Sequence, residues 1–224
     1  LGIKLADSIG STLVMANDPD ADRIGIAVKT KAGEWYYPNG NQMGLLILQY
    51  LLNNKKNIPA DAKVITTVVS TPMIDKIGAS ENVGVIKTLT GFKYIGEKIR
   101  QFEAKEIEGT YLFGFEESYG YLSGTYVRDK DAVVASMLVC EMAAYYKKQG
   151  KSLAEVIDGL YEEFGYYRCV NCGLVFIDPI PEALAQYYEG GYQGIPESID
   201  QLRELAAKER YRLAPVLDKC GGDL

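Results

Sequence analysis

The chain has 224 residues, of which 47% are hydrophobic and 24% are charged, and its formal net charge is -6. This composition is that of a globular protein with room for one domain and part of another. The acidic balance argues against the basic surface that nucleic-acid binding requires. The longest apolar run, residues 44–52, is far shorter than a membrane-spanning helix, and the N-terminus has no signal-peptide pattern. We therefore expect a cytoplasmic protein that binds neither nucleic acid nor a membrane.

The apolar runs alternate in type along the chain, which predicts strands and helices in turn. In chain order the pattern predicts a helical start, strands at 11–17 and 23–30, a hairpin return at 31–38, a helix at 41–56, a strand at 62–70, a helix at 71–82, a strand at 83–90, a helix at 92–104, a strand at 110–118 and helices at 129–149 and 152–165. Asn39 is expected to cap the helix that follows it, and Ser152 and Glu155 are spaced like a capping box. This alternation predicts a layered α/β/α domain with a mixed, mostly parallel sheet, whose chemistry lies at the carboxyl ends of its strands.

The missing residue types limit the chemistry further. The chain contains no histidine, which excludes Ser-His-Asp and Cys-His catalysis within it, and also any metal site built on imidazole. Its four cysteines do not make a disulfide scaffold in a chain of this size. Because the chain begins without methionine and within a helical pattern, we also expect it to be a piece of a longer protein.

The turn between the first two expected strands carries Asp18, Asp20 and Asp22, followed by Arg23. An EF-hand loop would need glycine and glutamate where Arg23 and Lys29 stand, so that interpretation fails. A phosphatase of the haloacid dehalogenase type would use Asp18 as nucleophile and Asp20 as acid, but normally has threonine or valine in place of Asp22. A Mg²⁺ site, with Arg23 holding a phosphate beside the metal, suits the hard carboxylate oxygens. A solvated acidic turn is the remaining alternative.

Three further stretches place polar residues at strand ends or helix starts. They hold Glu116, Glu117 and Ser118 after one strand, Gly91 and Lys93 where a strand meets a helix, and Arg128 and Lys130 at the start of a helix. Carboxylates and a hydroxyl suit sugar hydroxyl groups, glycine permits close backbone approach, and basic residues at a helix start favour an anionic ligand. Each feature alone is more often simply solvated, whereas their combination is specific.

The motifs DPDADR, TGFKYI, GFEES and RDKDA, in this order and at these distances, resemble those of the α-D-phosphohexomutases, most closely the bacterial phosphoglucomutase and phosphomannomutase branch. The resemblance covers residues 1–167. It implies the end of the second domain at residues 1–16 and the third domain at 17–167 of a four-domain enzyme. Such enzymes move phosphate between the C1 and C6 oxygens of a hexose through a phosphoserine and a bisphosphorylated intermediate, with Mg²⁺ as cofactor and glucose 1,6-bisphosphate as activator.

The resemblance also implies roles for single residues. Asp18, Asp20 and Asp22 would ligate Mg²⁺, and Arg23 would act catalytically beside the reacting phosphate. The expected substrate-binding residues are Thr90, Gly91 and Lys93 in one loop, Glu116 and Ser118 in a second, and Arg128 and Lys130 in a third. Of these, Glu116 and Ser118 would bind sugar hydroxyl groups, and Lys130 would reach the substrate phosphate.

The chain departs from the family in two places. The phosphoserine loop of these enzymes contains a histidine, so this chain lacks it, and the fourth domain also has no counterpart. Residues 168–224 instead resemble the N-terminal region of certain S-adenosylmethionine-dependent methyltransferases and are expected to be a foreign tail. Whether Cys169 and Cys172 of that tail bind zinc stays open.

These departures leave several functions open. We expect a phosphohexomutase fragment that is inactive alone and whose missing domains could come from another chain. A non-catalytic module that binds phosphosugar or mediates contacts is the alternative, beside the dehalogenase-like phosphatase. The preference between glucose and mannose phosphates and the oligomeric state are not expressed in the sequence.

Overall fold

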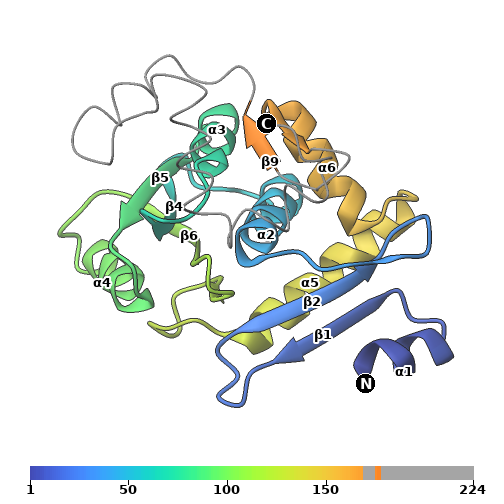
Figure 1. Ribbon diagram of the computed structural model, residues 1–224. Helices are drawn as coiled ribbons and strands as arrows, with labels where there is room; N and C mark the ends of the chain where they lie inside the picture. The colour runs from blue at the N-terminus through green and yellow to red at the C-terminus, as the bar shows by residue number, and fades with distance from the viewer. Residues whose placement is uncertain (169–174, 178–224) are drawn as a thin grey trace, which may run out of the picture. The chain divides into compact units, whose positions relative to one another are not determined.

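Two sheets organise the first part of the chain (Figure 1). The computed structural model describes residues 1–168 and 175–177, and the expected tail and its Cys169 and Cys172 otherwise lie outside the described residues. The chain divides into a unit of residues Leu1–Gly159 and a second unit that begins at Leu160. Among the described residues, we find no helix with the length and apolarity needed to cross a membrane.

The smaller sheet is antiparallel and follows helix α1 (Gly2–Ser8). Its strands, in spatial order, are β1 (Leu13–Asn17), β2 (Ile24–Lys29) and β3 (Trp35–Tyr36). The pairing of β1 with β2 ends at Asn17 and Ile24, so the aspartate-rich turn closes this hairpin. The expected hairpin arrangement of residues 11–38 is therefore confirmed.

The larger sheet is mixed and mostly parallel, in the spatial order β5-β4-β6-β7. Its strands are β4 (Ala62–Thr67), β5 (Gly84–Thr88), β6 (Thr110–Phe115) and β7 (Tyr121–Leu122), of which only β7 runs antiparallel to its neighbour. The helices around it are α2 (Gly40–Asn54), α3 (Met73–Ser80), α4 (Phe92–Glu103) and α5 (Ala132–Lys148), followed by α6 (Leu153–Glu163). A short antiparallel pair, β8 (Tyr166–Arg168) and β9 (Val175–Ile177), belongs to the second unit.

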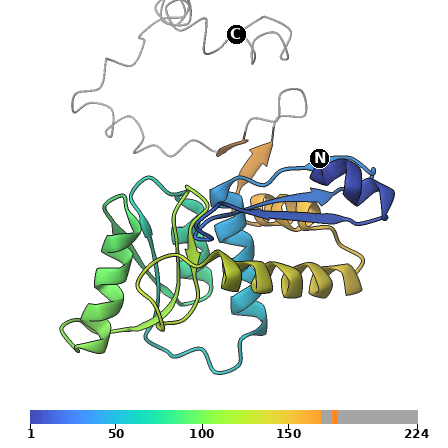
Figure 2. The ribbon, with the colours of Figure 1, turned by 90° about the horizontal axis from the view of Figure 1, so that it is seen from below.

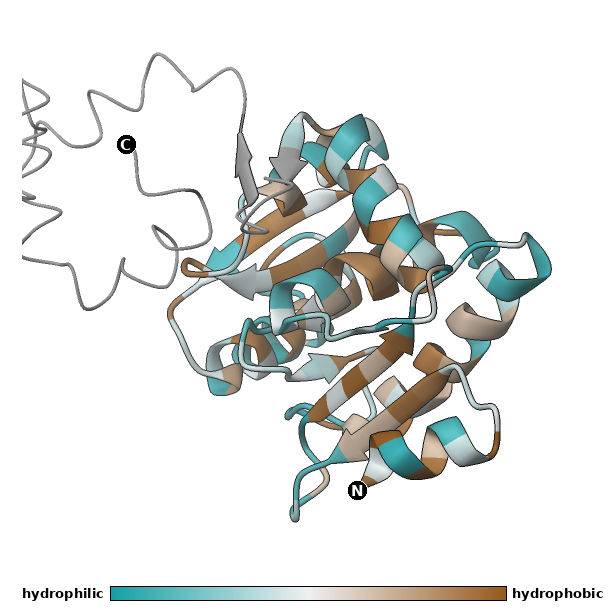
Figure 3. Cartoon of the chain, turned by 45° about the vertical axis from the view of Figure 1, so that its right-hand side comes forward, coloured by the Kyte–Doolittle hydropathy of each residue, from teal (hydrophilic) through white to brown (hydrophobic). Residues whose placement is uncertain are grey.

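Neighbouring residues of β6 show that helices cover both faces of the larger sheet (Figure 2). A Cβ atom placed on Gly114 would lie 2.9 Å from Ile95 of α4, whereas the ring of Phe115 lies against Gly44 of α2. Because successive strand residues face opposite sides, α4 and α2 lie on opposite faces. Figure 3 shows hydrophobic residues on the strands and polar residues in the loops that connect them. The expected α/β/α fold is confirmed.

Both expected helix caps are present. The Asn39 side chain accepts a hydrogen bond from the Gln42 backbone N–H at 3.0 Å, and the Gln42 side chain accepts one from the Asn39 N–H at 2.8 Å. The Ser152 backbone N–H donates to Glu155 at 2.8 Å, and the Glu155 N–H donates to the Ser152 hydroxyl at 3.3 Å. These reciprocal bonds satisfy backbone donors that a helix start would otherwise leave unpaired.

Several element ends differ from the sequence prediction. Strand β4 ends at Thr67 instead of residue 70. The Val68 N–H still donates a hydrogen bond to the Thr88 carbonyl, but the chain then turns away from the sheet, and Val68 is 56% exposed. Helix α5 begins at Ala132 instead of residue 129, because the Asp131 side chain caps it by accepting from the N–H groups of Val133 and Val134. Arg128 and Lys130 therefore precede the helix, and the expected helix-start position for them is wrong.

Candidate functional site

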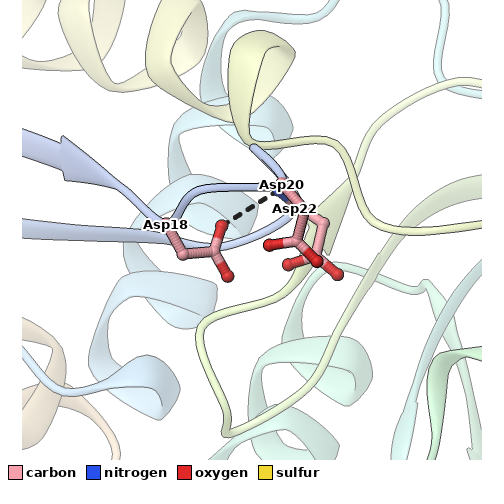
Figure 4. Close-up of side chains that lie close together, drawn as sticks. All are labelled: Asp18, Asp20 and Asp22. Carbon is pink, nitrogen blue, oxygen red and sulfur yellow. Dashed lines mark hydrogen bonds between the residues drawn. The ribbon is translucent and has the colours of Figure 1, made fainter.

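The hairpin turn between β1 and β2 brings the three aspartates together. One Asp18 oxygen accepts hydrogen bonds from the backbone N–H groups of Asp22 at 3.1 Å and Arg23 at 3.0 Å. Ala21 adopts a positive φ of 56°, which lets the chain reverse within this short segment. As a result, Asp18, Asp20 and Asp22 each offer one oxygen within 4.8 Å of the others, on one side of the turn (Figure 4). This donor set fits a hard divalent cation.

Hydrogen bonds hold Asp18 in its ionised form. The pKa of Asp18 is lowered to about 2, chiefly by the hydrogen bond from the Arg23 backbone N–H. Partial desolvation of the carboxylate opposes this shift, and the hydrogen bond from the Arg23 guanidinium adds to it. The guanidinium Nε lies 3.0 Å from Asp18 and 3.5 Å from Asp22. One oxygen of Asp22 is buried and accepts no hydrogen bond from any described residue. The turn thus presents carboxylate oxygens that its own donors do not saturate.

Lys130 reaches this turn from the loop before α5. Its Nζ lies 2.5 Å from Asp22 and 3.4 Å from Asp129, and only 18% of its side chain is exposed. Burial lowers the pKa of Lys130, but the two carboxylates raise it by more, so the net shift is upward. A Cβ atom on Gly120 would lie 2.5 Å from the Lys130 stem, so only glycine leaves room for this side chain. Lys130 is therefore a fixed cation beside the aspartates.

Backbone contacts join the aspartate turn to the loop after β6. Arg23 and Gly120 form a β-bridge, and the Ile24 N–H donates to the Tyr119 carbonyl at 3.2 Å. The Ala132 N–H at the start of α5 donates to the Ala21 carbonyl at 3.1 Å. These bonds place the turn, the loop after β6 and the segment before α5 side by side, although the turn lies far from the other two in the sequence.

Glu116 connects the two loops that were expected to contact a sugar. Its side chain is 5% exposed and accepts a hydrogen bond from the Gly91 N–H at 2.9 Å. Burial raises the pKa of Glu116, while the Gly91 N–H and then Lys130 act in the opposite direction. Gly91 has a φ of 116°, which a residue with a side chain rarely adopts. The loops after β5 and β6 therefore meet at Glu116.

A chain of hydroxyl groups holds the neighbouring Glu117. The Thr67 hydroxyl donates to Glu117 at 2.9 Å, and the hydroxyls of Thr67 and Ser70 lie 2.9 Å apart. Thr67 has one hydroxyl proton, which it donates to Glu117, so Ser70 must donate to Thr67. Thr67 is fully buried at the end of β4. This chain fastens the loop after β6 to the middle of the larger sheet.

The other expected substrate-binding residues are not drawn into these contacts. Thr90, Lys93 and Ser118 are exposed, and the Lys93 Nζ lies 4.8 Å from the Tyr94 ring centroid. Arg128 forms an ion pair with Glu103 of α4 and bonds to loop carbonyls instead of turning toward the aspartates. Thr90, Lys93 and Ser118 thus remain exposed, while Arg128 is held by Glu103 and by carbonyl groups of its own loop.

Sequence reasoning missed the residues that support this site. Thr67, Ser70 and Gly120 hold the loops or Lys130 in place but lie outside the quoted motifs, and Asp129 lies in the RDKDA motif without having been assigned a role. The hydroxyl-rich end of the β-branched run at residues 66–71 is the one signal that could have pointed to Thr67 and Ser70.

Comparison with known proteins agrees with this arrangement. Residues 39–164 match the family described as phosphoglucomutase/phosphomannomutase, alpha/beta/alpha domain III. A phosphoglucomutase of Staphylococcus haemolyticus (strain JCSC1435) is 33% identical over 205 residues, which cover 91% of this chain and 34% of that protein. The matched region therefore extends past residue 167. A phosphopentomutase of Mus musculus is 35% identical over 173 residues, which cover 75% of this chain and 28% of that protein. The chain thus spans about a third of the length of the curated relatives it matches.

Solved structures show the same fold. A candidate phosphomannomutase from Thermus thermophilus superposes with a TM-score of 0.58 at 26% identity, over 75% of this chain and 36% of that one. The open form of pp63/parafusin, a phosphoglucomutase from Paramecium, gives a TM-score of 0.52 at 20% identity, over 72% of this chain and 28% of that one, and supports the fold alone. Since the family match covers more than half of its residues, the chain belongs to the phosphoglucomutase/phosphomannomutase family.

Proposed function

We propose that this chain carries the metal-binding and sugar-binding loops of a Mg²⁺-dependent phosphohexomutase, an isomerase that interconverts hexose 1-phosphates and 6-phosphates. The observation that carries the proposal is the β-bridge between Arg23 and Gly120. This bridge puts the three converging carboxylates beside the loop of residues 116–120. Mg²⁺ would be held by Asp18, Asp20 and Asp22, and when bound it would neutralise charge on a phosphate in transfer.

The residues around the metal ligands would position the substrate. Arg23 and Lys130 supply two positive charges at the aspartate turn, suited to the oxygens of a phosphate group. Glu116 and Ser118 would accept and donate hydrogen bonds to sugar hydroxyl groups, and the loop of Thr90, Gly91 and Lys93 would approach the sugar from the other side. Because Glu116 is buried, its contact would make the site selective among sugars. A sugar that does not present a hydroxyl group to Glu116 would leave a buried polar group without a hydrogen bond.

Complete turnover would need parts outside these 224 residues. The phosphoserine loop and the domain that clamps the second phosphate would come from the rest of a longer protein or from another chain. The methyltransferase-like origin of residues 168–224 stays a prediction, as do the domain boundaries at 16 and 167, and whether Cys169 and Cys172 bind zinc stays open.

A set of measurements on the chain tests the proposal. We expect calorimetric titration to show weak Mg²⁺ binding. Mg²⁺ releases its bound water reluctantly, and without a phosphate the turn offers it only three carboxylate ligands. Glucose 1-phosphate should strengthen Mg²⁺ binding. The variant Lys130→Met should remove that strengthening, whereas the matched variant Lys55→Met, at an exposed site, should retain it.

The alternatives predict other results. With glucose 1-phosphate and glucose 1,6-bisphosphate supplied, we expect no isomerisation by the chain alone, because no positioned serine carries the phosphate. Mg²⁺-dependent release of phosphate that disappears in Asp18→Asn would favour the dehalogenase-like phosphatase. Tight Mg²⁺ binding retained in Asp20→Ala would remove the aspartate turn from the proposal.

A further inference from the structure

A second concave site lies at the opposite end of β1 and β2 from the aspartate turn. It has a volume of about 470 Å³ and is lined by the start of β1, the end of β2, the last turns of α5 and the loop that leads into α6. The aspartate turn follows the end of β1, so a strand of five residues, about 17 Å long, separates the two sites. The volume falls in the range of small-molecule pockets.

The lining combines an apolar wall with positive charge. Leu13, Val28 and Ala143 form apolar parts of the wall, and four lysines, Lys29, Lys31, Lys147 and Lys151, line it as well, while none of the described residues that line it is acidic. Such a cluster is unusual in a chain whose net charge is -6. The lysines come from two segments more than a hundred residues apart, which only the fold brings together.

Two of these lysines are paired and two are available. The Nζ of Lys29 lies 2.7 Å from Asp7, and the Nζ of Lys31 lies 2.6 Å from Glu155. Lys147 and Lys151 form no ion pair with any residue that the structure describes. Both side chains belong to exposed residues, so they can turn toward a ligand. Two uncompensated ammonium groups beside one cavity favour an anion with about two negative charges.

Interaction with the end of α5 explains only part of this cluster. A lysine in the last turn of a helix is favourable because the carbonyl groups there carry partial negative charge, and Lys147 occupies that position. Lys151 lies beyond the helix, where the Lys151 N–H donates to the Tyr146 carbonyl at 3.0 Å, and Lys29 and Lys31 come from the other wall. The helix end therefore accounts for one lysine of the four.

We propose that this cavity binds a small organic phosphate ester, with its apolar part against Leu13, Val28 and Ala143 and its phosphate between Lys147 and Lys151. A phosphate monoester carries about 1.5 to 2 negative charges at neutral pH and accepts several hydrogen bonds. The lysine stems add apolar surface around the ligand body while their charged ends reach the phosphate. The site shares no residue with the aspartate turn, so the proposal does not rest on mutase activity.

Titration with 1-naphthyl phosphate, followed by NMR, tests this site. We expect amide shifts at Thr12, Thr30 and Ala143, with 1-naphthol and inorganic phosphate each binding at least tenfold more weakly. The double variant Lys147→Gln/Lys151→Gln should weaken binding about tenfold. The charge-matched control Lys55→Gln/Lys56→Gln, at exposed positions in the loop after α2, should bind as the unmodified chain does.

Two further variants separate this cavity from the proposed active site. Ala144→Trp would fill the cavity without changing its charge and should abolish binding, which distinguishes a cavity from a merely basic surface. Lys130→Met should leave the shifts at Thr12 and Thr30 unchanged. Binding that survives both the double lysine variant and Ala144→Trp, or that shifts only residues of the aspartate turn, would overturn the proposal whatever the outcome for the mutase function.

Discussion

The two strands that lead into the candidate site, β6 of the larger sheet and β1 of the smaller one, are buried to very different degrees. In β6 every residue after Thr110 is buried, whereas no residue of β1 is. The loops that we propose bind sugar thus extend from a sheet covered on both faces, while the aspartate turn closes a hairpin in which β1 has no buried residue. Since local opening follows the density of buried contacts, the aspartate turn should open more readily than the Glu116 loop. In the proposed function, metal binding therefore belongs to the more adaptable of the two regions.

Truncation of one side chain in each strand should give the largest difference between β6 and β1. We expect Phe115→Ala, at a fully buried ring packed between Phe113 and Gly44, to lower the free energy of unfolding by about 3–5 kcal/mol. Met15→Ala in β1, where the side chain is 37% exposed, should cost less than about 1 kcal/mol. Denaturant unfolding measures both, and equal losses would contradict the contrast.

The hydroxyl chain at the end of β4 should give an intermediate effect. Thr67→Val keeps the shape but leaves Glu117 and Ser70 without their shared partner, and should lower the free energy of unfolding by about 1–2 kcal/mol. Hydrogen exchange at residues 116–120 should accelerate more than in β6 itself. Thr67→Ser, which restores the hydroxyl, should return exchange toward its original rate. Equal exchange in Thr67→Val and the unmodified chain would refute this role.

The strands and the aspartate turn illustrate what could be predicted from the sequence. The alternation of apolar runs located the three parallel strands of the larger sheet, β4, β5 and β6, and the spacing of Asp18, Asp20 and Asp22 predicted that their carboxylates could converge. The pattern overran the end of β4 because exposed Val68 and Val69 continue the apolar run without continuing the ladder. The apolar pattern reports only which residue types follow one another. The end of a strand depends instead on where the hydrogen bonds to the neighbouring strand stop.

The ion-pair partners of Arg128 and Lys130 could not be predicted from the sequence either. Arg128 and Lys130 are two residues apart in one motif, yet Lys130 pairs with Asp22 and Arg128 with Glu103. These pairings depend on where the loop before α5 crosses the aspartate turn and α4, and on the space that Gly96 and Gly120 leave for it. The two-residue strand β7 was also missed, because a segment this short has no usable periodicity.

The ionisation of Asp18 should give the smallest and most local effect. Because its pKa is lowered in the folded chain from 3.8 to about 2, the ionised carboxylate stabilises the turn above about pH 4, and that contribution is lost as the pH falls toward 2. Arg23→Ala should raise the pKa only partway toward 3.8, because the backbone N–H, the larger cause, remains. An NMR titration of the Asp18 carboxyl group would detect this, and a midpoint near 3.8 in the unmodified chain would refute it.

Paramagnetic broadening by Mn²⁺, added as a substitute for Mg²⁺, tests most directly whether the aspartate turn is a metal site shared with the sugar-binding loop. We predict that amide signals of residues 18–23, of 116–120 and of Lys130 broaden first, that those of residues 147–151 stay sharp, and that Asp20→Ala removes the selectivity. Broadening of the turn without residues 116–120, or broadening that is unchanged in Asp20→Ala, would contradict a shared metal and sugar site.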